Sequence, residues 1–226
     1  FSARFTNKTG ATFTQMFYDM GMSLAPFVNT PLNVISMGNG NTSLFSAYTS
    51  NSIGIGNNFT LNLGLNTQVL ALNKHWTLEP RIGMKWQATA KTSFALAYGL
   101  YSRMEKMDVY YTRTPQTGDE LVNKHLDFTK ANHFMLTFDY KISDDMLLKI
   151  EPYFQTLFDV PVRAGDSYSV LNREDFYVED ALVNKGKGRN IGVDVTLEKY
   201  LSRGYYYMFT GSLFDSRYCG GDKLWH

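Results

Sequence analysis

The chain has 226 residues, 44% of them hydrophobic and 15% aromatic, and a formal net charge of +1. This length allows one domain or two small ones, and the near balance of charge gives no electrostatic reason to expect nucleic acid as a partner. The single cysteine, Cys219, excludes an intrachain disulfide. No apolar run reaches the ~18 residues of a transmembrane helix, and known zinc, phosphate-binding and nucleophile spacings are absent. The sequence therefore predicts no catalytic residue, no metal site and no cofactor.

The first quarter of the chain is predicted to form strands and turns. Phe1–Phe5 alternates apolar with polar residues, and Asn7–Ala11 has the composition of a turn. A second strand is predicted at Thr12–Ala25. A loop rich in proline and glycine at 26–41 and another strand at Thr42–Ile53 follow.

The segment Phe59–Leu70, FTLNLGLNTQVL, has the clearest alternation in the chain. Alternate residues are apolar, with Thr67 as the only break: Phe59, Leu61, Leu63, Leu65 and Val69. The intervening residues are small or polar: Thr60, Asn62, Gly64, Asn66 and Gln68. Period-two alternation predicts a β-strand with one apolar face and one polar face. The apolar face must point either to the core of a soluble protein or to lipid.

Further alternating segments give about ten predicted strands in all. They lie at Thr77–Trp86, Ser93–Tyr101, His133–Tyr140, Met146–Gln155, Arg189–Tyr200 and Tyr205–Ser216. Short connections alternate with long ones at 26–41, 102–131 and 157–187, apart from the short LNKHW at Leu72–Trp76. Alternating short and long loops are typical of an up-and-down β-barrel whose short turns all lie at one end.

Three features favour lipid over a soluble core for the apolar face. Most predicted strands have nine to twelve residues, and about 9–11 are needed to cross a bilayer at the usual tilt. The polar face of Phe59–Leu70 has Asn, Gly, Thr and Gln but no Lys or Glu. Aromatic residues gather near strand ends, as in interface girdles: Trp76, Trp86, Tyr98, Tyr101, Tyr140, Tyr153, Tyr200 and Tyr205. A soluble β-sandwich binding module or lipocalin-like barrel also alternates and remains an alternative.

Two longer stretches resemble a known family. LEPRIGMKW (Leu78–Trp86), followed by SFALAYGLYSRMEKMDVYY (Ser93–Tyr111), resembles two strands and an outer loop of TonB-dependent outer-membrane receptors. LVNKGKGRNIGVDVTLEKYLSRGYYYMFTGSLFDSRYCGGD (Leu182–Asp222) is similar to a later motif of these receptors. There an Asn-x-Gly-x-Gly turn precedes a Gly-Val-Asp strand, and Ser-Arg-Tyr ends the next strand. The detail looks most similar to receptors of Bacteroidetes, and the resemblance covers most of residues 42–226.

The resemblance implies an all-β fold, an antiparallel up-and-down transmembrane β-barrel of about 22 strands closed by an N-terminal plug domain. Residues 1–226 would then be a partial barrel of about ten strands, without the plug and the C-terminal strands. The implied role is TonB-coupled uptake of a scarce solute such as an iron chelate, cobalamin or a glycan. The implied partners are outer-membrane lipid, the receptor's own plug, TonB through the plug, and an unknown solute. The implied location is the outer membrane of a Gram-negative cell.

The segment 102–131 contains the candidate ligand-binding residues. It is rich in thioether and aromatic side chains, and we expect it to form an outer loop. The candidates are Met104, Met107, Tyr110, Tyr111 and His125. Such residues suit an oily or planar ligand, but Met and Tyr also pack a loop against its neighbours, and the sequence leaves both interpretations open.

Other polar residues have two interpretations as well. In a barrel, Glu79, Arg81 and Lys85 point to the lumen, where they can pair with plug charges or with neighbouring strands. His75 is either a ligand contact or an interface residue. The acidic segment 166–180 contains clustered oxygen ligands, but its spacing matches no calcium loop.

Outer-membrane barrels also include enzymes and small porins. Serines are abundant, but no Ser-His pair has a spacing that indicates a nucleophile and its base. The resemblance therefore implies a transporter rather than an enzyme, with a small porin or a barrel enzyme as the alternatives.

Overall fold

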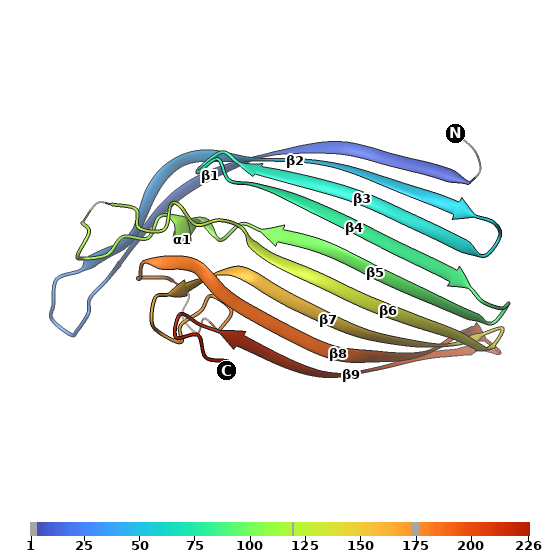
Figure 1. Cartoon of the computed structure of the whole chain (residues 1–226). Coiled ribbons are helices and arrows are strands. Elements are labelled where there is room, and N and C mark those ends of the chain that lie inside the picture. Colours follow the sequence, from blue (N-terminus) through green and yellow to red (C-terminus); the bar gives the residue numbers. More distant parts are fainter. Residues whose placement is uncertain (1–3, 119, 173–176) are drawn as a thin grey trace.

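The computed structural model describes residues 4–118, 120–172 and 177–226. These residues form one antiparallel sheet of nine strands and one short helix (Figure 1). The elements are β1 (Phe5–Leu24), β2 (Asn33–Ile55), β3 (Phe59–Leu70), β4 (Trp76–Gln87), β5 (Thr92–Arg103), α1 (Met107–Tyr110), β6 (Thr129–Ser143), β7 (Met146–Arg163), β8 (Leu182–Ser202) and β9 (Tyr205–Cys219).

Each strand pairs with the next one along the chain, so the sheet is an up-and-down meander. Connections of two to four residues join β2–β3, β4–β5, β6–β7 and β8–β9 at one end (Figure 1). The longer connections 104–128 and 164–181 lie at the other end with 25–32 and 71–75. The predicted alternation of short turns and long loops is confirmed, and we call these ends the turn end and the loop end.

The N-terminal part differs from the sequence prediction. Asn7–Ala11 is not a turn but part of β1, paired without a break with β2 from Asn51 to Ala47. The polar residues that suggested a turn form cross-strand bonds instead, such as Asn7 Nδ2 to Asn51 Oδ1 at 2.8 Å. Of the predicted strand Phe1–Phe5, residues 1–3 lie outside the described residues.

The predicted loop 26–41 is also shorter than expected. β2 begins at Asn33, and the glycine-rich run Met37–Asn41 pairs with β1. The Cβ of any larger residue at Gly38 would lie 2.6 Å from the ring of Tyr111, so this glycine lets a loop side chain pack on the strand. The glycines that predicted a loop in this run therefore lie in a strand, where one of them allows close packing.

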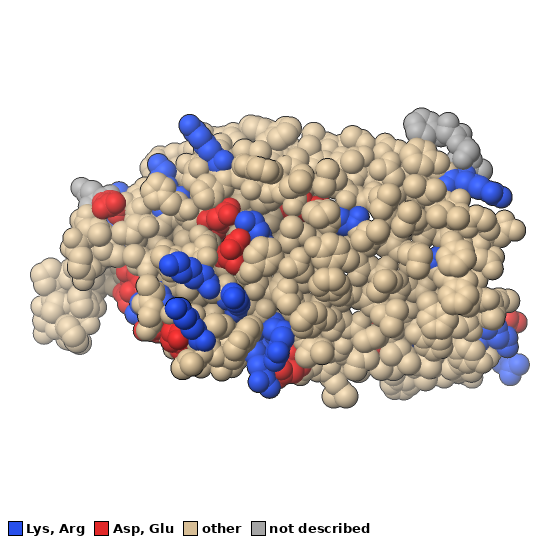
Figure 2. Space-filling view, viewed as in Figure 1, with Lys and Arg blue, Asp and Glu red and all other residues tan. Residues whose placement is uncertain are grey.

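The two faces of the sheet have opposite character. Leu63, Leu65 and Ile82 are 38%, 42% and 47% exposed on one face, although they are large apolar side chains. Asn66 and Gln68, which alternate with them on β3, are hydrogen-bonded to β4 on the other face. In the view of Figure 2, a broad expanse over the middle of the strands has few charged groups. The apolar face of Phe59–Leu70 is thus uncovered among the described residues.

A row of aromatic rings crosses the apolar face near the turn end. Phe59 stacks on Trp86 with ring centroids 5.9 Å apart, and Trp86 on Phe94 at 5.7 Å. Phe94 contacts Phe138 at 5.3 Å, so the row joins β3, β4, β5 and β6. These residues are direct cross-strand partners. Of the aromatic residues predicted to gather near strand ends, Trp86 belongs to this row.

The buried apolar core lies at the loop end. Its centre combines Leu70 of β3 with Val109 and Tyr110 of α1, and with Phe128 from the same connection. No helix among the described residues is long and apolar enough to cross a membrane. A β-sandwich would need a second sheet against the first, whereas all the strands of the described part belong to one sheet. The sandwich alternative is therefore wrong for this part of the chain.

A substitution of Gly186 on β8 can test the packing at the loop end. Its added Cβ would lie 2.3 Å from Val162 Cγ1 and 2.9 Å from the Val160 carbonyl oxygen. We expect Gly186→Ala to lower the free energy of unfolding by about 1–3 kcal/mol through overpacking, measured by denaturant titration. Gly211→Ala is the control, since nothing lies within 4 Å of its added Cβ. Equal stability of the two variants would contradict the packing described here.

Candidate functional site

Glu79 is the centre of a buried cluster on the polar face of the sheet. It lies on β4 and is only 1% exposed. The β3–β4 register places Asn66 directly opposite Glu79 and Gln68 opposite Thr77. Glu79 accepts hydrogen bonds from Asn66 Nδ2 at 2.9 Å, Gln68 Nε2 at 2.7 Å, Thr77 Oγ1 at 3.1 Å and the Ser102 hydroxyl. A buried carboxylate is tolerated because its oxygens are paired in this way.

Arg81 supplies the positive charge beside this carboxylate. Its Nη2 lies 3.0 Å from Glu79 Oε2, and its guanidinium lies 4.4 Å from the ring centre of Tyr101 on β5. The two predicted lumen residues Glu79 and Arg81 therefore pair with each other and with neighbouring strands. The structure assigns no ion pair to Lys85 within the described part of the chain.

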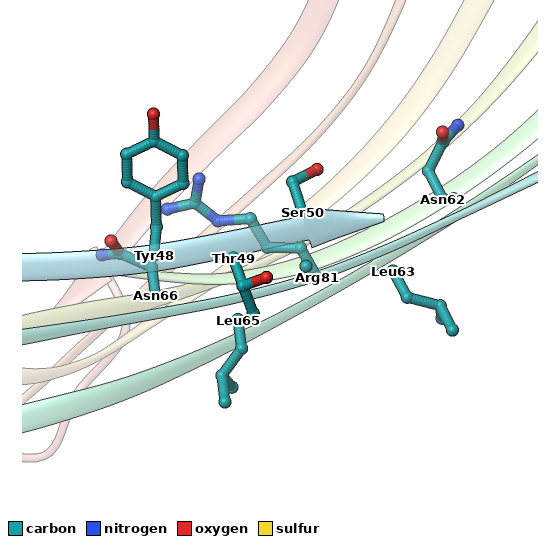
Figure 3. A pocket seen from close by; sticks show the side chains of 10 residues that line it. Tyr48, Thr49, Ser50, Asn62, Leu63, Leu65, Asn66 and Arg81 are labelled. Carbon is teal, nitrogen blue, oxygen red and sulfur yellow. The ribbon is translucent and has the colours of Figure 1, made fainter. Parts of the chain in front are cut away.

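A hollow of about 380 Å³ adjoins Arg81 on the polar face. Figure 3 shows Tyr48, Ser50, Asn62 and Arg81 on one side of the strands, whereas Leu63 and Leu65 point to the other side. Gly64 and Gly83 also line the hollow, where a side chain would otherwise fill it. This wall offers hydroxyl, amide and guanidinium groups to water or to a polar body.

The loop end brings together four of the five candidate ligand residues. Met104, Met107 and Tyr111 are partly buried and pack against the apolar core, of which Tyr110 is a fully buried member. Burial raises the pKa of Tyr110 to about 12, and its hydroxyl accepts a hydrogen bond from the Glu105 N–H at 3.2 Å. Tyr110 thus packs α1 onto the sheet and presents no surface to a ligand in this conformation.

Tyr111 and His125 differ from Tyr110 in their surroundings. The Tyr111 hydroxyl is hydrogen-bonded to that of Tyr18 on β1. Burial is the larger cause, and this hydrogen bond the second, of a pKa of Tyr111 raised to about 12. His125 is exposed and lies outside the packed cluster. The five candidates therefore do not form one continuous exposed surface, and their contact with a solute stays a prediction.

A charged cluster at the loop end was not identified from the sequence. His75 Nδ1 lies 3.1 Å from Asp127 Oδ1, and Lys130 Nζ lies 2.9 Å from both Asp127 and Asp159. Burial opposes ionisation of Asp127, but hydrogen bonds from Lys130 and His75 outweigh it and hold the pKa of this carboxyl below its ordinary value. Because these residues come from two connections and two strands, no local pattern in the sequence indicates the cluster.

Other sequence candidates have structural partners or lie outside the described residues. Glu174 and Asp175 of the acidic segment are not among the described residues. Arg163 is paired with Asp166 at 3.5 Å and with Asp180 at 3.3 Å. Within residues 4–118, 120–172 and 177–226, no group of three or more His, Cys, Asp or Glu could hold a metal ion.

The sheet is similar in fold to part of the barrel of solved outer-membrane transporters. No protein-family model and no curated protein matches the sequence. The chain is similar to the FrpB iron transporter from Neisseria meningitidis (TM-score 0.64, 16% identity, 99% of this chain and 35% of that one). It is also similar to the copper transporter OprC (TM-score 0.63, 11% identity, 98% and 36%). A third similar structure is the outer membrane transporter YddB from Escherichia coli (TM-score 0.62, 10% identity, 95% and 30%).

These likenesses confirm the predicted fold class, an all-β antiparallel up-and-down barrel segment, at identities that show the fold alone. The described residues have nine strands where about ten were predicted, because the two N-terminal segments form one strand. The chain spans about a third of the length of each of these structures. The number of strands in a complete barrel stays a prediction.

The Glu79 cluster makes a direct prediction about stability. Glu79→Ala leaves Gln68, Ser102 and Arg81 without their shared acceptor, so we expect the free energy of unfolding to fall by about 2–4 kcal/mol. Denaturant titration measures the loss. Ser50→Ala removes an exposed hydroxyl from the same face and is expected to change stability by under about 0.5 kcal/mol. A Glu79→Ala loss as small as that of Ser50→Ala would contradict the role of Glu79.

Asp127 makes a prediction about pH. Its folded-state pKa lies below the ordinary value of about 3.9. Its stabilising contribution is therefore fully present above about pH 4 and is lost as pH falls through the lowered pKa. We expect Asp127→Asn to lower the free energy of unfolding at neutral pH by about 1 kcal/mol, allowing for solvent screening. The difference from wild type should vanish in acid.

The measurement is the free energy of unfolding of both proteins from neutral pH to about pH 2, below the ordinary carboxyl pKa. Asp19→Asn, at an exposed position on β1, is the control and should parallel wild type throughout. A gap between wild type and Asp127→Asn that persists in acid would show that its ionisation is not the cause.

Proposed function

We propose that this chain is the membrane-spanning barrel wall of an outer-membrane receptor that imports a scarce solute with energy delivered through TonB. In this proposal the nine strands belong to a barrel of about 22 strands, in the outer membrane of a Gram-negative cell. The receptor type favoured by the sequence motifs is that of Bacteroidetes. The solute is an iron chelate, cobalamin or a glycan.

The observation that carries the proposal is the contrast between the two faces of one sheet. Leu63, Leu65 and Ile82 are exposed on one face, whereas the other face contains a buried carboxylate with all its partners. Uncovered apolar side chains over so long a face are unfavourable in water. A bilayer removes that cost, and the polar face then lines the barrel lumen.

Three further features support the membrane assignment. The aromatic row from Phe59 to Phe138 lies across one end of the apolar face, where outer-membrane barrels have aromatic girdles. Short turns at one end and long loops at the other are the arrangement of outer-membrane barrels. The similar solved structures are transporters, two of them for iron and copper. These support transport as the class of activity, with a porin or a barrel enzyme as the less favoured alternatives.

The loop end is the proposed solute-facing part of this chain. Met104, Met107 and Tyr111 are only partly buried and pack against the same core on this connection. His125 provides an exposed polar group on the same connection. Tyr110 contributes by fixing α1 rather than by contact. The polar wall around Arg81 is the proposed contact for the receptor's own plug domain, through which TonB acts.

A pair of neighbouring substitutions tests the membrane assignment. Leu63 and Asn62 are adjacent on β3, both exposed, and point to opposite faces. In protein folded into phosphatidylcholine vesicles, we expect Leu63→Lys to lower the free energy of unfolding by about 2–4 kcal/mol. Asn62→Lys, on the lumen side, should change it by less than about 1 kcal/mol.

One result would contradict the membrane assignment. If the protein is folded and monomeric in plain buffer, and Leu63→Lys is no more harmful there than Asn62→Lys, the apolar face does not contact lipid. The proposed function would then fail with the membrane assignment.

A further inference from the structure

The outward face of β8 changes character along its length. Ile191 and Val195 are 51% and 39% exposed on the apolar face of the sheet, and we call the exposed apolar part of this face the apolar band. Towards the loop end, the next three residues with the same alternation are Arg189, Lys187 and Lys185. Because alternate residues of a strand share a face, three successive outward positions directly beyond the apolar band are basic.

A cleft of about 510 Å³ lies beside these residues. Lys185 and Lys187 of β8 line it together with Lys223 and Trp225 of the C-terminal segment, and with Cys219 at the end of β9. The three lysine side chains are exposed. Trp225 is 50% exposed, and the Arg189 guanidinium lies 5.6 Å from the centre of its ring.

The C-terminal segment is fixed in this position by backbone contacts. Gly221 forms a parallel bridge with Ala164, and the Asp222 N–H donates to the Asp166 carbonyl at 3.0 Å. A Cβ on Gly221 would lie 2.0 Å from the Arg163 carbonyl oxygen, so only glycine allows this approach. The position of Lys223 is therefore set by the fold.

The acidic residues nearby are already paired. Asp215 lies 3.0 Å from Arg217 and 3.9 Å from Arg189, and Asp222 lies 2.9 Å from His226. The structure assigns no ion pair with a described residue to the three lysines of the cleft. Figure 2 shows Lys and Arg side chains gathered over this end of β8 and β9. The cleft is thus a concentration of positive charge with little local neutralisation.

We propose that this cleft, lined by Lys185, Lys187 and Lys223, binds the phosphate group of a membrane lipid in the outward-facing leaflet. The inference rests on the proposed function, since it needs the apolar band to contact acyl chains. Three ammonium groups lie where the band ends, at the level of lipid headgroups. Lysine ammonium groups bind phosphate as point charges, and basic clusters beside a spanning segment attract anionic lipids.

The geometry favours a lipid over a free anion or the transported solute. The cleft opens on the apolar side of the sheet, opposite the Glu79 cluster and the hollow beside Arg81. Trp225 adds an exposed indole beside the lysines, and indole rings prefer the membrane interface. A lipid can place its phosphate among the lysines while its acyl chains lie along Ile191 and Val195.

The test compares lipid retention by wild-type protein and two triple variants. Protein is inserted into vesicles of phosphatidylcholine with a minor share of phosphatidic acid, then extracted in neutral detergent, and the retained lipids are quantified by mass spectrometry. The cleft variant is Lys185→Gln, Lys187→Gln, Lys223→Gln. The control variant is Lys85→Gln, Lys91→Gln, Lys141→Gln, which removes the same charge from exposed lysines towards the turn end.

We expect wild type and the control variant to enrich phosphatidic acid at least tenfold over phosphatidylcholine relative to the vesicles, and the cleft variant to lose this enrichment. Equal retention of both lipids by wild type, or undiminished enrichment in the cleft variant, overturns the proposal. Displacement of phosphatidic acid by equimolar inorganic phosphate would show a site for soluble phosphate instead, which also overturns it.

Insertion into vesicles of phosphatidylcholine alone separates this proposal from the proposed function. Those vesicles have no net charge, so insertion reports only on the apolar face. Failure to insert defeats the proposed function, and this inference with it. Insertion without enrichment of phosphatidic acid defeats this inference alone.

Discussion

The continuous hydrogen-bonded ladder of β1–β9 is the constraint on which the rest of the structure depends. The inner strands β2–β8 pair their backbone groups with a neighbour on each side, so they need no second layer to pair them. In the described sheet β1 and β9 are paired on one side only. Successive side chains then point to opposite faces, and a slip of one residue would exchange Leu63 with Asn62. The opposite character of the two faces therefore follows from register.

Buried charge is the second constraint, and pairing meets it in two places. Glu79 is enclosed on the polar face by donors from β3, β4 and β5. Asp127 is held at the loop end between His75 and Lys130. An unpaired carboxylate would be strongly unfavourable at the buried Glu79 and less so at the partly exposed Asp127. These clusters fix the strands at mid-sheet and the long connection at its end, which together position the polar wall and the loop core.

Much of the fold was predictable because its signal is local. The alternation in Phe59–Leu70 and the turn composition of segments such as Leu201–Gly204 identify strands and reversals within a few residues. The prediction at Asn7–Ala11 was wrong because polar residues of a cross-strand ladder have the same composition as a turn. The direction of Glu79 was predictable from alternation, but its donors depend on register with β3 and on the approach of Ser102.

The candidate site was less predictable because segments far apart in the chain assemble it. Tyr110 and Tyr111 are adjacent on one connection, yet one is enclosed in the core while the other bonds Tyr18 of β1. The lysine cleft combines β8 with the C-terminal segment. Nothing in the spacing of those lysines indicates a cleft, since Lys223 comes beside Lys185 through tertiary contacts such as the Gly221–Ala164 bridge.

The sequence by itself determined that this chain forms long strands with one apolar and one polar face, joined by alternating short and long connections. Those properties depend on the period of two in side-chain direction and on turn residues, which are local. Only the tertiary structure decided which strands pair in which register, which loop side chains are enclosed, and which charges meet. Each of these depends on contacts across long separations, such as the Asp127 N–H with Asn184, 57 residues away.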